Sequence, residues 1–154
     1  MSDTHSYKTL LVAVDGSAQA DYALGHATAL ARDLGARLII VSVVDSISLI
    51  ATAGPYVAQT PDLIAIAHEE GKQILSAAAE FVAHSSVPYE KILADGSPID
   101  QIIAIANQQN ANMIVMGTHG RSGLGRLILG SVAEGVIHKS HVPVVIARVG
   151  TEKR

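Results

Sequence analysis

The chain has 154 residues, of which 49% are hydrophobic, a length and composition suited to one domain with its own core. It has no cysteine, which excludes disulfide frameworks, thiolate-bound metal sites and thiol nucleophiles. A net charge of −3 and an aromatic content of 3% argue against nucleic-acid binding, which usually needs a basic surface and stacking platforms.

The first half of the chain predicts two buried strands around one helix. Residues 1–6 are polar, and no apolar run approaches about 20 residues, so we expect a cytoplasmic protein with no leader and no membrane span. Residues 9–14 are almost all apolar, which is typical of a strand buried on both faces. Apolar residues then recur at helical spacing over 20–34, and residues 38–44 predict the second strand. Residues 45–60 are left unassigned, as a lid, an interface or a disordered loop.

The second half continues the alternation of strands and helices. In chain order we predict a helix at 61–84, a strand at 89–94, a helix after Ser97, a strand at 113–116, a glycine-rich segment at 117–130, a helix at 131–139 and a strand at 142–149. Gly35 is placed to cap the first helix, and Ser97, Pro98 and Asp100 form a capping pattern for the third. Strands joined through helices predict an α/β fold with a parallel sheet covered on both faces. We expect one domain over 1–154, with flexible ends at 1–6 and 150–154.

The glycine-rich segment follows a predicted strand, where ligands bind in open parallel sheets. It contains five glycines, which let backbone N–H groups approach an anion closely. No Asp or Glu occurs from Gln101 to Ala133, whereas Arg121 and Arg126 lie inside this stretch. A helix begins at its end, and its dipole favours negative charge. These features predict a phosphate site; the alternative is a flexible loop with glycine turns.

Three well-known glycine motifs fail at one or two positions of this segment. A phosphate-binding P-loop would need a lysine and a hydroxyl where Arg126 and Leu127 stand. The dinucleotide fingerprint fails at Ile128, and the serine-hydrolase elbow fails at Gly123. The spacing that does fit is G-x2-G-x9-G-[ST], which begins at Gly117 and continues through Gly120, Gly130 and Ser131.

This spacing, together with residues 10–17, 114–121, 130–132 and 142–144, makes the chain resemble the universal stress protein family, in its nucleotide-binding branch. The resemblance covers nearly the whole chain. The resemblance implies a Rossmann-like, single-domain sheet of five parallel strands in the order 3-2-1-4-5, with helices on both faces. It also implies a homodimer and adenine nucleotide binding, usually ATP, which we expect to be bound with Mg²⁺.

The resemblance also assigns site residues. By position they are, for adenine and ribose, Ala13, Asp15 and Val43; for ribose and the α-phosphate, Met116, Gly117, His119 and Gly120; and for the outer phosphates, Gly130, Ser131 and Val132. Arg121 and Arg126 would contact either phosphate or solvent. Asp15 could instead serve only a turn, because Asp95 occupies the same Asp-Gly-Ser context, and Ser131 could also be a helix cap.

The remaining candidates are weaker. His138 and His141 have a spacing that poorly supports a metal site, so we expect none, and we expect His5, His26, His68 and His84 to face solvent. The last strand would lie at a sheet edge, where an exposed apolar strand tends to pair. We therefore expect a homodimer through Val142 to Arg148.

The function that we expect is ATP binding by a cytoplasmic, nucleotide-dependent stress-response regulator or sensor with an unidentified protein partner. The first alternative is a slow ATPase, phosphotransferase or autophosphorylating enzyme, with Ser122 or Ser131 as acceptor and Asp15 or His119 as base. The second is an interaction module that binds no nucleotide. The sequence fixes no catalytic constellation, so the binding role is favoured.

Overall fold

The computed structural model describes residues 5–55, 62–118 and 129–149. These residues form one five-stranded sheet in the order β3-β2-β1-β4-β5, with every neighbouring pair parallel. The strands are β1 (Thr9–Ala13), β2 (Arg37–Val44), β3 (Tyr89–Asp95), β4 (Met113–Gly117) and β5 (Val144–Ala147). The expected topology is therefore confirmed, and β1 and β4 are neighbours at the point where the strand order reverses.

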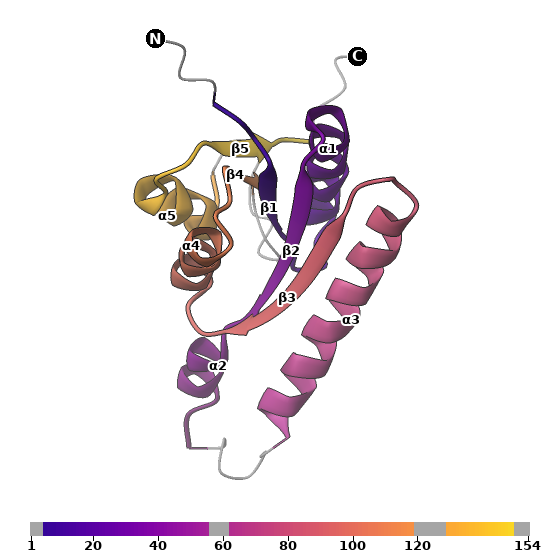
Figure 1. Cartoon of the computed structure of the whole chain (residues 1–154). Coiled ribbons are helices and arrows are strands. Elements are labelled where there is room, and N and C mark those ends of the chain that lie inside the picture. Colours follow the sequence, from indigo (N-terminus) through magenta and orange to yellow (C-terminus); the bar gives the residue numbers. More distant parts are fainter. Residues whose placement is uncertain (1–4, 56–61, 119–128, 150–154) are drawn as a thin grey trace, which may run out of the picture.

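Within the described ranges, five helices join the strands. They are α1 (Ala18–Leu34), α2 (Ser46–Ala53), α3 (Leu63–Ala83), α4 (Pro98–Gln108) and α5 (Ser131–Lys139). Helices α1 and α3 cover one face of the sheet, and α4 and α5 cover the other (Figure 1). The short helix α2 lies beyond the end of β2 and contacts α3. Among the described residues, no helix is long and apolar enough to cross a membrane.

The core has two layers, one on each face of the sheet. On β2, Leu38 and Ile40 belong to the layer under α1 and α3, whereas Ile39 and Val41 belong to the layer under α4 and α5. All four side chains are fully buried. Both faces of the strand need apolar residues, which explains why the strand sequences are continuously apolar rather than alternating.

Two parts of the chain differ from the sequence prediction. Residues 46–53, left unassigned, form α2, and the Asp45 carboxylate caps this helix by accepting a hydrogen bond from the Ser48 N–H at 3.0 Å. None of the residues of α2 is buried, so its apolar positions follow no core-facing stripe that could reveal it. The last strand is shorter than expected, spanning Val144–Ala147 rather than 142–149.

The helix caps are partly as predicted. Gly35 has a φ of 64° and its N–H bonds back to Ala31 and Arg32, as a left-handed cap requires. Ser97 is the N-cap residue of α4, with Pro98 in the first turn, but its side chain makes no capping hydrogen bond. The Ser17 hydroxyl caps α1 by accepting from the Ala20 N–H at 3.1 Å.

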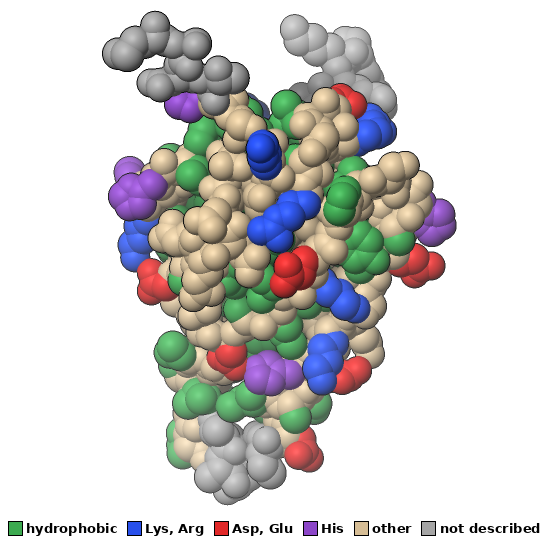
Figure 2. All heavy atoms as spheres, in the orientation of Figure 1, with side chains coloured by type: hydrophobic (Ala, Val, Ile, Leu, Met, Phe, Trp, Pro, Cys, Tyr) green, Lys and Arg blue, Asp and Glu red, His purple; other side chains and the backbone are tan. Residues whose placement is uncertain are grey.

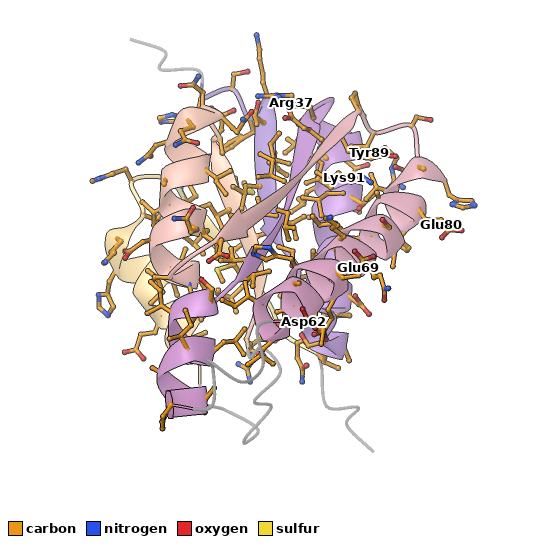
Figure 3. All side chains as sticks on the ribbon, turned by 90° about the horizontal axis from the view of Figure 1, so that it is seen from below. Arg37, Asp62, Glu69, Glu80, Tyr89 and Lys91 are labelled. Carbon is orange, nitrogen blue, oxygen red and sulfur yellow. The ribbon has the colours of Figure 1, made fainter. Side chains whose placement is uncertain are left out.

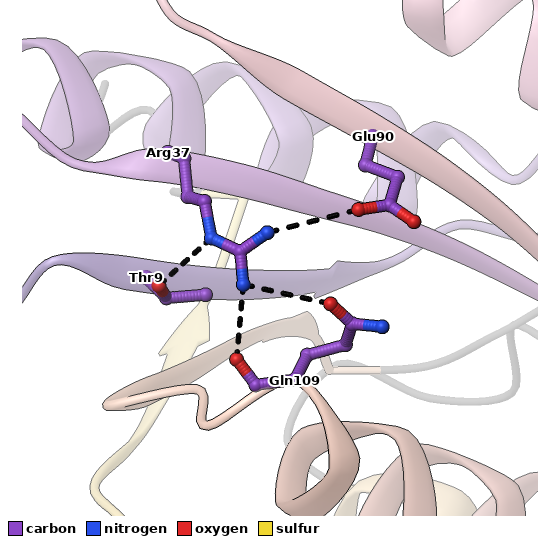
Figure 4. A network of polar contacts seen from close by, with 4 residues as sticks. All are labelled: Thr9, Arg37, Glu90 and Gln109. Carbon is purple, nitrogen blue, oxygen red and sulfur yellow. Dashed lines mark hydrogen bonds and ion pairs between the residues drawn. The ribbon is translucent and has the colours of Figure 1, made fainter.

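A polar network fastens the amino-terminal edge of the sheet (Figure 4). The Arg37 side chain on β2 donates from Nε to Thr9 Oγ1 on β1 at 3.1 Å, and from Nη2 to the Gln109 carbonyl after α4 at 3.1 Å. Its Nη1 lies 3.7 Å from a Glu90 carboxylate oxygen on β3. Arg37 and the start of β3 can be followed from below in Figure 3. The network joins three strands and leaves the opposite, carboxyl-terminal edge to the loops that form the site.

Candidate functional site

A cavity of about 350 Å³ opens at the carboxyl ends of β1, β2 and β4; we call it the main pocket. Ligand sites of open parallel sheets occur at this edge, next to the reversal of strand order. Eight of the residues assigned by resemblance line it: Ala13, Asp15, Val43, Met116, Gly117, Gly130, Ser131 and Val132. The other two, His119 and Gly120, lie outside the described residues, as do Arg121, Ser122 and Arg126.

One end of the main pocket is the amino terminus of α5. The first backbone bond of this helix runs from the Glu134 N–H to the Gly130 carbonyl at 2.9 Å. The N–H groups of Ser131, Val132 and Ala133 therefore precede that ladder, where an anion can accept hydrogen bonds and meets the positive end of the helix dipole. Gly130, not Ser131, is the N-cap residue, so the prediction that Ser131 could cap the helix was wrong.

The other end of the main pocket is apolar. Ala13 and Val43 approach from the sheet, Met116 from β4, and Pro98 and Ile102 from the first turns of α4. An apolar slot next to an anion-binding helix terminus suits a ligand with a flat, weakly polar body and a charged tail. Sequence reasoning missed Pro98 and Ile102, because their part in the wall depends on how α4 packs across the sheet.

Asp15 lines the main pocket and also fixes the turn after β1. Its Oδ1 accepts a hydrogen bond from the Ser17 N–H at 2.9 Å, while Ser17 caps α1. Gly16 between them has a φ of 80°, a conformation that glycine adopts without strain. The turn role and a ligand role are therefore compatible, since the turn holds the carboxylate at the pocket edge.

Gly117 has a packing reason to be glycine in addition to its place in the pocket lining. A Cβ at this position would lie 2.8 Å from the backbone oxygen of Gln19, in the first turn of α1. Backbone cannot yield as a side-chain tip can, so any larger residue would push β4 and α1 apart. This motif glycine therefore serves the fold as well as the site.

The second Asp-Gly-Ser sequence has a different role from the first. Asp95, at the end of β3, accepts hydrogen bonds from the Ser46 hydroxyl of α2 and from His68 Nε2 of α3, the latter at 2.6 Å. These two hydrogen bonds hold the pKa of Asp95 below its ordinary value, and the bond from Ser46 has the larger effect. Asp95 is absent from the lining of the main pocket. His68 was expected to face solvent, but it is held by this pair and its side chain is 38% exposed.

Charge elsewhere on the molecule is dispersed. On the face shown in Figure 2, acidic and basic side chains alternate with apolar ones, and no large patch has a single sign. His138 Nε2 lies 4.0 Å from Glu134 on the same helix. Among the described residues, no group of three or more His, Asp or Glu side chains is arranged to hold a metal ion.

Comparison with known proteins places this fold in a family. The model of the universal stress protein family matches residues 6–148. The chain belongs to this family. Among its curated members, universal stress protein YxiE of Bacillus subtilis is 34% identical over 92% of this chain and 99% of its own length. Universal stress protein MJ0531 of Methanocaldococcus jannaschii is 31% identical, covering 92% of this chain and 82% of its own.

Solved structures of related proteins share the architecture. The protein MJ0577 superposes with a TM-score of 0.82 and 27% identity, over 96% of this chain and 99% of that one. A universal stress protein from Archaeoglobus fulgidus, solved in complex with dAMP, gives 0.66 and 29%, over 92% and 98%. Another member, solved in complex with cAMP, gives 0.67 and 26%, over 93% and 98%. Two relatives of this fold therefore hold adenine nucleotides.

Proposed function

We propose that this protein binds an adenine nucleotide in the main pocket and acts as a nucleotide-dependent regulator or sensor in a cytoplasmic stress response. The observation that carries the proposal is the union, in one cavity, of an apolar slot and the amino terminus of α5. The dAMP and cAMP complexes of two relatives support the choice of adenine nucleotides. A protein partner would respond to the loops that surround the bound nucleotide.

The proposed orientation places the base in the apolar slot and the phosphates at α5. Ala13, Asp15 and Val43 would hold adenine and ribose, with Met116 and Gly117 beside the ribose and α-phosphate. His119, Gly120 and Arg121 complete this part of the proposal. The outer phosphates would lie beside Gly130, Ser131 and Val132 and accept hydrogen bonds from the unbonded N–H groups of the first turn of α5, since a helix N-terminus is a ready anion site. The cavity volume of about 350 Å³ lies within the range of known ligand pockets.

ATP is the proposed nucleotide, and Mg²⁺ its counterion. Asp15 is the carboxylate in the lining of the main pocket, and the described residues offer no metal cluster. Mg²⁺ commonly keeps several waters and is held through substrate phosphates with one or two carboxylates. We therefore propose that the ion is held mainly by the nucleotide and does not need a site of its own in the protein.

Calorimetric titration of nucleotide-stripped protein tests the proposal. ATP with Mg²⁺ should bind about once per chain with a Kd in the micromolar range, equivalent to roughly −8 kcal/mol. Parallel titrations with AMP, cAMP and GTP would rank the phosphate and base requirements. Absence of saturable heat with every adenine nucleotide, at two temperatures, would rule out the proposed site.

Asp15→Ala should weaken the binding of adenosine by about tenfold or more, because a hydrogen bond to a charged group contributes roughly 1.5–3 kcal/mol. The matched variant is Asp15→Asn, whose amide oxygen can still accept from the Ser17 N–H and so preserves the turn. Calorimetry with adenosine, which has no phosphate, isolates this end of the site. Equal affinity in all three proteins would leave Asp15 with the turn role alone.

We also propose a homodimer formed through β5, which is an edge strand of the sheet. The wild-type protein should then sediment at twice the chain mass of 16.0 kDa, and Val145→Asp should sediment as a monomer. Val145 packs partly against the α1/α3 layer, so a melting curve must show that the variant is folded. Val149→Asp, at a position 56% exposed beyond the strand, is the control and should stay dimeric. If Val145→Asp is folded and still dimeric, the dimer interface does not lie at β5.

A further inference from the structure

A second pocket, of about 390 Å³, lies on the other side of the sheet from the apolar slot. It is formed by the end of β2, by α2 and by the first half of α3, and it borders the main pocket at Asp15 and Val43. Apart from these two shared residues, the proposed nucleotide orientation does not use its lining. Its size falls within the range of small-molecule sites, so the chemistry of its lining residues can indicate which class of ligand it would bind.

The floor of the second pocket contains Ser42, a polar residue that is only 3% exposed. Side chains alternate along β2, and Leu38 and Ile40 belong to the α1/α3 layer, so Ser42 points to the same face, toward α3. Within the described parts of the chain, none of the hydrogen bonds involves the Ser42 hydroxyl. No buried side-chain oxygen or nitrogen of the described residues lacks a hydrogen-bond partner, so the unbonded Ser42 Oγ is the part of this side chain that reaches the pocket, where it can bond to a ligand.

The rim of the second pocket is acidic. Asp15, Asp45 and Glu70 line it, and none of its described lining residues is Lys, Arg or His. Ser48 donates to Asp45 from its N–H at 3.0 Å and from its hydroxyl at 2.7 Å, bonds that fix this carboxylate in place. A cation is attracted to such a rim, whereas a phosphate is repelled, which separates this pocket from the anion site at α5.

The other walls of the second pocket are aliphatic. Val44 contributes from β2, Leu49 from α2, and Ile74 from α3. An aliphatic stem can lie along such walls while its charged head stays among carboxylates, as lysine side chains do at protein surfaces. The Ser42 hydroxyl, the carboxylates and the aliphatic walls together match one class of ligand, a short alkyl chain that ends in an ammonium group.

We propose that the second pocket is a binding site for a small aliphatic amine in its ammonium form. The stem packs between α2 and α3, the ammonium group lies among the three carboxylates, and the Ser42 hydroxyl accepts one of its hydrogen bonds. This site does not depend on the proposed nucleotide function, because its test uses protein free of nucleotide.

Nuclear magnetic resonance titration of the uniformly ¹⁵N-labelled full chain provides the test. The probe is n-butylamine at neutral pH, and the neutral comparison is 1-butanol, both at constant ionic strength. The amine should cause saturable shifts at the amides of Ser42, Ser48 and Gly71, with a Kd near or below about 1 mM. Absence of saturable shifts, or equal shifts with 1-butanol, would overturn the proposal.

Matched variants distinguish specific binding in the second pocket from general attraction of a cation to an acidic protein. Glu70→Gln should weaken amine binding by about threefold or more, whereas Glu69→Gln, one residue away on α3 and outside the pocket lining, should leave it unchanged. Figure 3 labels Glu69 on this helix. Equal losses in both variants would overturn the proposal.

Ser42→Ala tests the floor of the second pocket by two readouts. Amine affinity should fall about threefold or more, while the melting temperature should stay about the same, because within the described residues this hydroxyl makes no hydrogen bond that the variant would lose. An unchanged affinity, or a marked fall in melting temperature, would show that Ser42 serves the fold and not a ligand.

Discussion

Gly130→Val should reduce ATP affinity by at least about 100-fold while the chain still folds. Gly130 lines the main pocket as the N-cap of α5, and its N–H donates to the Thr118 carbonyl at 2.6 Å. A branched side chain there would occupy the space through which a phosphate approaches the first-turn N–H groups. Calorimetry with ATP measures the loss, and AMP shows whether the α-phosphate alone is affected.

The fold should tolerate Gly130→Val because Gly130 has a φ of −64° and a ψ of 156°, an ordinary extended conformation for any residue. Loss of a glycine N-cap should cost about 1 kcal/mol of helix stability. Gly25→Ala is the matched control, since a Cβ at Gly25 meets no atom within 4 Å and the site is distant along α1. If Gly130→Val binds ATP as the wild type does, the phosphates do not lie at α5.

Ile114→Ala should lower the free energy of unfolding by about 3–4 kcal/mol, a large share of the roughly 5–15 kcal/mol typical of a domain. Ile114 is fully buried in the α4/α5 layer, and β4 pairs it with Leu11 on one side and Val144 on the other. Truncation leaves a void that neighbours on two strands cannot close without breaking their register. Thermal melting should show a fall of about 10 °C.

The control for this stability experiment is Ile66→Ala on α3. The chemistry of the substitution is the same, but Ile66 is 63% exposed, so the expected change is within about 0.5 kcal/mol. Comparable losses in both variants would mean that the stability of this chain does not reside in the core layers around the central strands. Chemical denaturation with urea would give the same comparison at constant temperature.

The layered fold could be predicted because its signals are local. Continuous apolar runs such as 9–14 indicate strands covered on both faces, and helices between them require parallel crossovers. The strand order was not determined by these signals; it came from the resemblance carried by the glycine spacing, and the sheet confirms it. Helix α2 could not be predicted, because its stability does not come from a buried stripe.

Parts of the site could not be predicted because they depend on contacts between distant segments. Pro98 and Ile102 reach the main pocket only through the packing of α4 across the sheet. The clash that requires Gly117 involves Gln19, which is remote in sequence. Similarly, Asp95 and Asp15 share a local sequence, yet one is bonded to His68 and the other lines the main pocket. Local sequence does not distinguish them.

The place of β1 in the middle of the sheet also affects how the protein is made. The backbone N–H groups of Lys8 and Thr9 both donate to the Asn112 side chain at 2.9 Å, and Lys8 and Asn112 are 104 positions apart. A ribosome adds about 5–20 residues per second. Several seconds therefore pass between the synthesis of β1 and that of β4, the strand that pairs with its second edge. Helix α5 emerges later still. A nascent chain would therefore be unable to hold the proposed nucleotide until synthesis is nearly complete, and only a finished molecule could gain stability from binding it.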